Sequence, residues 1–401
     1  MEPHIRLVTR WPGQEDAAGT YLLLLNRAPN MNGLPVCAGN CKVPTVVRYT
    51  SGGRAVQFGT EAVDNIEGLD DTTLAKWFKL FLHPMAMRTQ NHLTPPPLPR
   101  GVTLKTVYAD MLAYLFKHAR QFVDSSSLDA LGRGSLWMRL KSNFVLVMAI
   151  PNGWDDSQQA FLREAVVSAG ILPFDHDHER LKFVSESEAS VHFAINYANI
   201  GTWLRKGTTF AVCDAGGSTV DTTVYKCVAE APQLRLEEVT SSECVQAGSA
   251  LLDHEAKQFL QYKLTGSKYG TPDMIDIMVQ EFERKTVGIL LSYPGQELTV
   301  SFQKRKFDGS QQRSVIQFGN TYDNDRPRVI AGRVTLTWYC AIFALLKVFG
   351  LTKRSRSEEV KDIFKRTVEL IINSVEDILN RAGACEVRKS CHLKHFSRSL
   401  N

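Results

Sequence analysis

Apolar residues gather in short runs and periodic stripes along the chain, and the run beside a pair of glycines is the most informative. Phe210–Val212 is apolar, Gly216 and Gly217 follow, and β-prone residues resume up to Tyr225. Apolar and β-branched residues on both sides of a glycine pair predict two antiparallel strands around a tight turn.

Strand and helix patterns recur on both sides of this hairpin. The run Phe144–Ile150 is continuously apolar, which is typical of a strand covered on both faces. Short strand or loop pieces are predicted at Ile5–Pro12 and Tyr21–Leu25. Further strands or strand-like pieces are predicted at Lys42–Tyr49, Ala55–Phe58, Leu234–Val239, Leu298–Phe302 and Gly332–Leu336. Apolar residues at helical spacing predict helices at Leu74–Leu82, Leu104–Phe122, Ser157–Ala169 (capped by Asp155 or Asp156), Met274–Leu291 and Glu358–Leu379. A further helix is predicted to follow Glu243–Ala250 and to run through Tyr262.

The turn of the central hairpin combines glycines with two carboxylates, Asp214 and Asp221. Glycine lets the backbone approach a ligand closely and adopt positive φ, so several N–H groups can point at one oxyanion. Carboxylates beside an anion would repel it, so the arrangement favours a hard cation such as Mg²⁺, with its waters, between them. The pattern predicts a hairpin for phosphate and magnesium. An ordinary glycine hairpin with solvated aspartates is the alternative.

Composition and charge indicate which classes of partner the chain is expected to bind. The chain of 401 residues is 44% apolar and 22% charged, which is ordinary for a soluble globular protein. Its net charge of +5 is diluted, and the basic run Lys353–Arg356 lacks aromatic neighbours, which favours a solvated face over a nucleic-acid surface. The longest apolar run, Trp338–Leu351, is interrupted by Lys347 and is too short to span a bilayer. We therefore expect no nucleic-acid and no membrane partner.

The cysteines and the first residues bear on the compartment. The eight cysteines are scattered, and Cys37 and Cys41 lack the second ligand pair that zinc needs. Free thiols fit a reducing compartment. The first residues lack the charged and then apolar design of a signal peptide. We expect a cytoplasmic protein.

The hairpin residues resemble the second phosphate loop in the nucleotide-binding domain of the seventy-kilodalton heat-shock chaperones (Hsp70). That family lies within the actin, sugar-kinase and chaperone ATPase superfamily. The matching residues are Asp214, Gly216, Gly217, Thr219 and Asp221, and Ser218 stands where the chaperones usually have a third glycine. The segment Val147–Leu172 (VMAIPNGWDDSQQAFLREAVVSAGIL) resembles the same family nearly element for element, and the divergent character resembles a fungal branch.

This resemblance implies a two-lobed, actin-like α/β fold of the ribonuclease H type. It implies lobe I at residues 1–200 and lobe II at residues 201–401. Within lobe II it implies a lower subdomain at 201–249 and about 330–383, an upper subdomain at 250–329 and an irregular tail at 384–401.

The resemblance also implies site roles. Amides of the loop Gly216–Thr219 would hold the β- and γ-phosphates of ATP, and the Thr219 hydroxyl would bond a phosphate oxygen. Asp214 and Asp221 would hold the hydrated Mg²⁺ through water. Gly248 would sit against phosphate, or else serve as an ordinary glycine at a helix entry.

Two further roles lie outside the hairpin. Glu186 stands at the family's glutamate that orders the metal's water shell, the alternative being a carboxylate favoured by a helix dipole. Ser187 replaces the family's proline, which is tied to coupling with the client domain. A lysine, either Lys79 or Lys76, would reach the γ-phosphate or the attacking water, and the local pattern favours Lys79. A lysine lying over an apolar helix face is the alternative.

Some family features are not matched. Glu283 and Arg284 are only weak candidates for contacts with adenosine. The first phosphate loop is not found upstream of Val43, and neither the closing segment after Gly383 nor a client-binding domain is found. These departures suggest a truncated or degenerate member. We therefore expect a chaperone-like protein that binds Mg-ATP and hydrolyses it weakly or not at all. The alternatives are a non-catalytic protein that binds other proteins and, less favoured, a sugar-kinase-like phosphotransferase.

Overall fold

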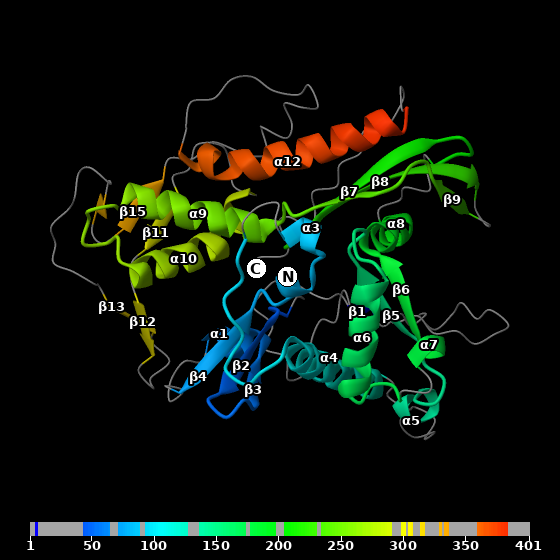
Figure 1. Cartoon of the computed structure of the whole chain (residues 1–401), viewed down its shortest axis with the longest axis horizontal. Helices are drawn as coiled ribbons and strands as arrows, with labels where there is room; N and C mark the ends of the chain where they lie inside the picture. The colour runs from blue at the N-terminus through cyan, green and yellow to red at the C-terminus, as the bar shows by residue number, and fades with distance from the viewer. Residues whose placement is uncertain are drawn as a thin grey trace. The chain divides into compact units, whose positions relative to one another are not determined.

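The structure is a computed structural model of the whole chain, which divides into two compact units, Met1–Ile200 and Gly201–Asn401. It describes residues 5–6, 43–64, 71–88, 93–126, 136–173, 177–197, 204–230, 234–290, 298–301, 304–307, 313–316, 329–330, 333–336 and 359–383. Both units combine helices and sheets, which confirms a mixed α/β fold (Figure 1). The two-lobed, ribonuclease H-like architecture and the subdomain boundaries stay predictions.

The first unit contains two sheets. Its strands are β1 (Ile5–Arg6), β2 (Val46–Thr50), β3 (Ala55–Phe58), β4 (Thr72–Lys76), β5 (Leu146–Ile150) and β6 (Leu181–Ser185). One sheet has the order β3-β2-β4 and is antiparallel throughout. The other has the order β1-β5-β6, in which β5 and β6 run parallel while β1 pairs antiparallel to β5.

Helices accompany these sheets. They are α1 (Gly59–Asp64), α2 (Lys79–Leu82), α3 (Met85–Arg88), α4 (Leu104–Ser126), α5 (Leu136–Leu140), α6 (Asp156–Ser168), α7 (Asp177–Arg180) and α8 (Glu186–Tyr197). Helix α6 begins where it does because Asp155 caps it. The Asp155 carboxylate accepts from the Ser157 amide, and the Gln158 side chain accepts from the Asp155 amide. This reciprocal capping box satisfies amides that a helix start leaves unpaired.

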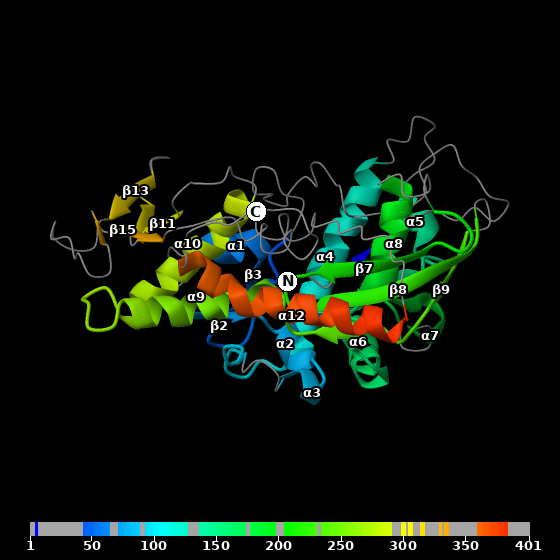
Figure 2. The ribbon, with the colours of Figure 1, turned by 90° about the horizontal axis from the view of Figure 1, so that it is seen from above.

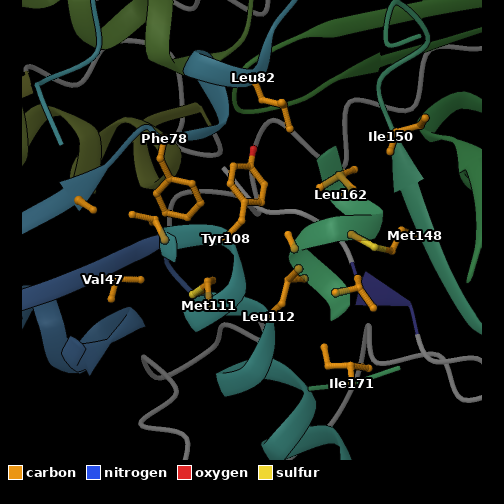
Figure 3. Packing of buried hydrophobic residues seen from close by; sticks show 14 of the residues in the cluster. Val47, Phe78, Leu82, Tyr108, Met111, Leu112, Met148, Ile150, Leu162 and Ile171 are labelled. Atoms are coloured by element: carbon orange, nitrogen blue, oxygen red, sulfur yellow. The ribbon is translucent and has the colours of Figure 1, made fainter. Parts of the chain in front are cut away.

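The core of the first unit forms between α4, α6 and both sheets, and Figure 3 shows many of its side chains. Strand β5 contributes Met148, helix α6 contributes Leu162, and helix α4 contributes Leu112, each at most 1% exposed. Helices α4 and α6 pack against each other. The continuous apolar character of β5 is thus explained by burial within this core.

The second unit is built on a sheet of order β10-β8-β7, with β9 also paired to β8. These strands are β7 (Thr209–Ala215), β8 (Val220–Ala229), β9 (Arg235–Glu238) and β10 (Glu243–Val245). Smaller sheets are formed by β11 (Leu298–Ser301), β14 (Val329–Ile330) and β15 (Arg333–Leu336), and by β12 (Lys304–Phe307) with β13 (Arg313–Ile316). The predicted hairpin around the glycine pair is confirmed as β7 and β8.

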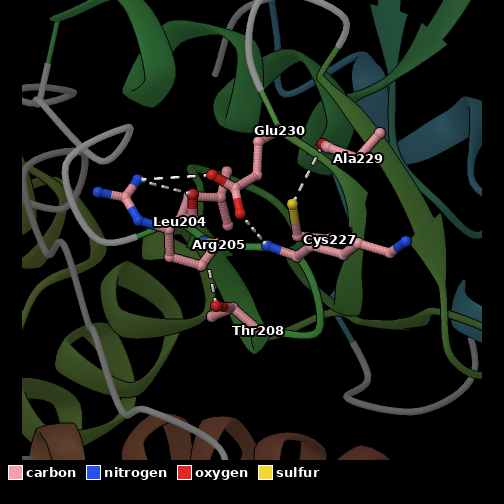
Figure 4. Close-up of polar contacts among 7 residues, drawn as sticks. Leu204, Arg205, Thr208, Cys227, Ala229 and Glu230 are labelled. Atoms are coloured by element: carbon pink, nitrogen blue, oxygen red, sulfur yellow. Dashed lines mark hydrogen bonds and ion pairs between the residues drawn. The ribbon is translucent and has the colours of Figure 1, made fainter.

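The end of β7 and β8 remote from the glycines is closed by a polar turn (Figure 4). The Glu230 carboxylate accepts from the Lys206 amide at 3.0 Å, and the Thr208 hydroxyl accepts from the Arg205 amide at 3.1 Å. The Cys227 amide donates to the Thr208 carbonyl at 2.9 Å. The Lys206–Glu230 and Cys227–Thr208 bonds join the ends of the two strands and so fix their register from this end, because a slip by one residue would break both.

Three long helices complete the described part of the second unit, namely α9 (Ser249–Lys263), α10 (Pro272–Leu290) and α12 (Glu359–Arg381). Helix α12 packs on α9, β8 and β10, and Figure 2 shows it running beside α9 and β8. Its apolar stripe, predicted from the sequence, is buried at Ile363, Phe364, Val368, Ile371 and Ile378.

One predicted element is wrong. The segment Leu74–Leu82 is not a single helix, because Leu74, Ala75 and Lys76 belong to β4 and only Lys79–Leu82 is helical. Strand β4 pairs along its full length with β2, and this pairing overrides the amphipathic pattern. Trp77, at φ 55°, lies in the left-handed region and turns the chain from the strand into the helix.

The other predicted strands and helices that fall on described residues are confirmed with small shifts of their ends, except that only Ile5–Arg6 of the predicted piece Ile5–Pro12 is described, as β1. Several predictions fall outside the described residues: Tyr21–Leu25, Cys37, Cys41, Trp338–Leu351, Lys353–Arg356 and the tail 384–401. Among the helices that the structure describes, none has both the length and the apolar composition required to cross a bilayer.

Replacing Leu162 by Ala should lower the free energy of unfolding by about 2–5 kcal/mol, because it leaves a cavity in the core of the first unit. The change is measured by chemical denaturation. Val145→Ala, at a side chain that is 48% exposed, is the control and should stay within about 0.5 kcal/mol of the parent. Equal effects of the two substitutions would contradict this account of the core.

Candidate functional site

The candidate site in the second unit is the turn between β7 and β8. The strands are paired up to this turn, with Asp214 opposite Asp221 and Ala215 opposite Val220. The Gly216 amide donates to the Thr219 carbonyl at 2.9 Å and closes the turn. Because directly opposed residues of an antiparallel pair share one face of the sheet, the two aspartates lie on the same face, at the base of the turn.

The start of helix α9 holds the turn from one side. The amides of Gly248, Ser249 and Ala250 donate to the carbonyls of Ser218, Gly216 and Gly217 at 3.2, 3.2 and 2.9 Å. The Ser249 hydroxyl also lies 3.3 Å from the Gly217 carbonyl. The first amides of a helix lack partners within it, and here the carbonyls of the turn supply them.

These hydrogen bonds from the start of α9 orient the peptide units of the turn. In a trans peptide the carbonyl and the following amide point in opposite directions. Since the carbonyls of residues 216, 217 and 218 point at α9, the amides of Gly217, Ser218 and Thr219 are directed away from it. Three successive amides on one side form the kind of concave backbone surface that binds anions.

Gly248 permits the close approach. It is the N-cap of α9, and a Cβ atom at this position would lie 2.5 Å from the Gly217 carbonyl carbon and 2.5 Å from the Ser218 nitrogen. Any side chain would therefore collide with the backbone of the turn. Gly248 is a helix-entry glycine, and its amide is engaged with the turn itself.

Two observations test whether these residues fit a phosphate and a hydrated cation. Thr219 is 1% exposed, and its hydroxyl oxygen has no hydrogen-bond partner within the described residues, so it is available to a phosphate oxygen. Asp221 is fully buried and Asp214 is partly buried. The described ranges contain no group of three or more His, Cys, Asp or Glu side chains placed to hold a metal directly. Two carboxylates that reach a cation through its waters fit this pattern, as for Mg²⁺.

The first unit brings together two of the residues that the sequence singled out. The Lys79 ammonium lies 2.9 Å from a carboxylate oxygen of Glu186, and the two side chains are 8% and 11% exposed. Lys76, by contrast, lies on β4 with its ammonium over the Trp77 ring at 5.5 Å. Of the two candidate lysines, Lys79 is therefore the one paired with Glu186.

Local sequence places each partner of this pair. Glu186 is the first residue of α8, which begins there because the Ser185 hydroxyl accepts from the Glu188 amide at 3.1 Å. Ser187 is fully buried, and its hydroxyl accepts a hydrogen bond from the Asn152 side chain at 2.9 Å. This bond ties the start of α8 to the loop that follows β5.

Two aromatic side chains surround Lys79. The Trp154 ring centroid lies 5.6 Å from the ammonium of Lys79, and the indole N–H donates to Nδ1 of His83 at 3.1 Å. His83 is fully buried, and this desolvation, with the charges of Lys79 and Arg88, lowers its pKa to about 3. The imidazole is therefore neutral, and its proton is on Nε2 because Nδ1 accepts.

Sequence reasoning missed His83, Trp154 and the Asn152–Ser187 bond. The only sequence signal was position: His83 lies four residues after Lys79, and Trp154 immediately precedes the cap of α6. For the predicted adenosine contacts, Glu283 is half-buried on α10, whereas the side chain of Arg284 lies outside the described residues.

The mixed α/β fold is consistent with an Hsp70-like or actin-like ATPase. No model of a known protein family matches this chain. Human heat shock 70 kDa protein 12A is 22% identical over 404 residues, which cover 87% of this chain and 56% of that protein. Human heat shock 70 kDa protein 12B is 22% identical over 396 residues, covering 85% and 54%, and mouse 12A is 21% identical over 404 residues, covering 87% and 56%.

This distant homology over most of the chain supports membership of the Hsp70-like, actin-type ATPase superfamily. The chain spans slightly more than half the length of these curated relatives. The assignment to a fungal branch stays a prediction.

Replacing Gly248 by Ala should lower the free energy of unfolding by about 1–3 kcal/mol, because the methyl group would force α9 and the turn apart. Thermal or chemical unfolding measures the change. Gly52→Ala is the matched control, since its nearest atom would be the Thr50 hydroxyl at 3.8 Å. If both substitutions were neutral, α9 would not be packed on the turn as described.

The buried His83 predicts a pH dependence of stability. Below about pH 6.5 the unfolded histidine takes up a proton, whereas the folded one stays neutral until about pH 3. The free energy of unfolding therefore falls as pH decreases through this window, by at most about 1.4 kcal/mol per pH unit from this group. The variant His83→Gln keeps an acceptor for Trp154. Its free energy of unfolding, measured with urea at pH 4–7, should fall less steeply with decreasing pH than that of the parent. If the free energies of variant and parent fell in parallel, the role given to His83 would be wrong.

Proposed function

We propose that this chain is a chaperone-like nucleotide-binding protein that binds ATP with Mg²⁺ and hydrolyses it weakly or not at all. The observation that carries the proposal is the turn Gly216–Thr219, whose carbonyls are held by α9 and whose base carries Asp214 and Asp221. The resemblance of this turn to the second phosphate loop of the Hsp70 chaperones, together with the distant homology, supports the same ligand. A cytoplasmic location and protein partners belong to the same proposal.

Each residue has a role in this proposal. The amides of Gly217, Ser218 and Thr219 bind phosphate oxygens, and the Thr219 hydroxyl donates to one of them. Asp214 and Asp221 hold Mg²⁺ through its waters. When bound, Mg²⁺ neutralises negative charge on the phosphates.

The resemblance to the Hsp70 chaperones implies the remaining roles for a pair in the first unit: Glu186 would order a water, and Lys79 would contact the γ-phosphate. Phosphoryl transfer depends mostly on positioning and charge stabilisation. The Lys79 ammonium is bonded to a carboxylate oxygen of Glu186. An ammonium has three donor hydrogens, so this bond does not prevent a contact with a phosphate oxygen.

Calorimetric titration of the full chain with ATP and Mg²⁺ tests the proposal. The parent should bind, and Asp214→Asn with Asp221→Asn should weaken binding by about 10–100-fold, because the carboxylates orient the waters of the cation. The matched control is Asp362→Asn with Asp377→Asn, two exposed residues of α12 that give the same change in charge. It should bind as the parent does.

An absence of heat with a demonstrably folded parent would refute nucleotide binding and favour a non-catalytic interaction protein. Transfer of phosphate from ATP to a small acceptor would instead favour the kinase alternative.

A further inference from the structure

Arg48 is a buried cation on the sheet of order β3-β2-β4 in the first unit. Successive side chains of a strand point to opposite faces, so Val47 and Tyr49 belong to the core face of β2 and Arg48 belongs to the other face. A charged residue at such a position is expected to reach water. Arg48 is nevertheless only 6% exposed, and helix α1 packs on β2 and β3 over its side chain.

The guanidinium of Arg48 is bonded to two neighbouring elements. Its Nη2 atom donates to the Ala62 carbonyl of α1 at 2.6 Å, and its Nη1 atom donates to the Thr72 hydroxyl of β4 at 3.2 Å. These bonds use two of the five donor hydrogens of the group. The Nε atom is also buried, and it has no hydrogen-bond partner in the part of the chain that the structure describes. Both acceptors are uncharged, so neither balances the positive charge.

Arg48 and Lys79 are the only arginine or lysine side chains that the structure describes as buried, and their surroundings differ. Lys79 has the Glu186 carboxylate at 2.9 Å. The polar contacts of Arg48 within the described residues include no carboxylate. Desolvation lowers the pKa of the Arg48 guanidinium without removing its charge, since arginine stays protonated in proteins. A buried charge without a counter-charge is strongly unfavourable, so this position favours the binding of an anion.

Gln57 provides a second unsatisfied group beside this cation. It lies directly opposite Arg48 in the pairing of β2 with β3, which makes the two side chains neighbours on one face of the sheet. The Oε1 atom of Gln57 is buried and has no hydrogen-bond partner among the residues described. A side-chain amide carries both a carbonyl and an NH2 group, so it can bond to an anion or to a protonated oxygen.

We propose that Arg48, with Gln57 beside it, binds an oxyanion, namely the carboxylate or phosphate group of a small molecule, between the β3-β2-β4 sheet and α1. The guanidinium offers Nε and one further hydrogen on each Nη atom, and such a planar fork suits the oxygens of these groups. The site depends on contacts of the first unit alone and is independent of the nucleotide proposed for the glycine turn. An arginine that only ties α1 to the sheet is the alternative. That role accounts for the two hydrogen bonds but leaves the charge unbalanced.

Helix α1 is the described element that covers the guanidinium, and it is short. It consists of the six residues Gly59–Asp64, and a helix of this length depends on tertiary contacts. One of these contacts is the bond from Arg48 to the Ala62 carbonyl. The ligand enters when α1 moves away from β2, a movement that needs no change in the strand pairing of the sheet.

The first test observes Arg48 directly in the full chain. The Nε–H signal of Arg48 is followed by heteronuclear NMR while acetate or inorganic phosphate is added at constant ionic strength. The signal should shift and reach saturation, whereas the signal of Arg54, an exposed residue of the same hairpin, should not. Saturation by acetate assigns a carboxylate ligand, and saturation by phosphate alone assigns a phosphate. If neither anion gives a saturable shift of the Arg48 signal, the proposal is overturned.

The second test compares the affinities of variants for the same anion, measured from the backbone amide signals of β2 and β3. These signals belong to the first unit, so phosphate at the glycine turn of the second unit does not enter the measurement. Arg48→Met should weaken binding by about 10–100-fold, the range for hydrogen bonds to a charged group. Arg48→Lys keeps the charge without the fork and should weaken it less. Arg54→Met is the matched control and should bind as the parent does. Equal affinities of parent and Arg48→Met would refute the site.

The third test places the missing carboxylate in the chain itself. Gln57→Glu should raise the midpoint of thermal unfolding by about 1–4 °C and abolish the response to added anion, because a cross-strand pair of opposite charges then replaces the ligand. In the Arg48→Met background the same change should lower the midpoint, since the new carboxylate is buried without a cation. A change of midpoint that is the same in both backgrounds contradicts the proposal. If Arg48→Met does not fold, the titration of the parent and the effect of Gln57→Glu decide.

Discussion

The contact between the start of α9 and the glycine turn is the constraint on which the candidate site depends. A helix start leaves amides without partners, and a tight turn leaves carbonyls without partners. In this chain the two sets satisfy each other, through Gly248, Ser249 and Ala250 on one side and residues 216–218 on the other. The contact has a directional consequence, because peptide planarity then turns the amides of the same residues to the opposite side. The anion-binding surface follows from how the turn is anchored, and Gly248 is required because no side chain fits between the two backbones.

The first unit contains a charged pair that is mostly shielded from water. Lys79 and Glu186 are both mostly buried, and burying charges is unfavourable unless they are paired and further satisfied. The indole face of Trp154 provides an additional favourable contact for the cation, and the helix start at α8 provides one for the anion. The residues that make these contacts are far apart in sequence. They belong to the loop after β5, which carries Trp154, and to the start of α8, which carries Glu186. The contacts around the pair therefore contribute, together with the attraction of the two charges, to its fixed position.

Local chemistry made much of the fold predictable. The hairpin, the Asp155 cap and the stripe of α12 each depend on residues close together in sequence, and each is confirmed. The segment Leu74–Leu82 was predicted wrongly because its first residues pair with β2, and that pairing is invisible in the local pattern. The same limit explains why His83 and Trp154 were missed, since their hydrogen bond joins residues that are 71 positions apart. Lys79 and Glu186 were named only through resemblance, and the distance between their charged groups could come only from coordinates.

Ser187 shows how a departure from the family pattern is accommodated in this chain. The Hsp70 chaperones that the sequence resembles have a proline here, whose ring would fix φ and so hold the backbone beside the glutamate. This chain has a serine that is fully buried, and its hydroxyl accepts from Asn152 in the loop that also carries Trp154. The backbone beside Glu186 is thus held by a side-chain hydrogen bond to that loop. On the other side of Glu186, the Ser185 hydroxyl accepts from the Glu188 amide and caps the start of α8. Because Asn152 and Trp154 belong to one short turn, a displacement of that turn would act on both members of the ion pair, on Glu186 through Ser187 and on Lys79 through the indole ring. The loop after β5 therefore links the positions of the two charges, a connection that a proline at position 187 could not make through a side-chain hydrogen bond.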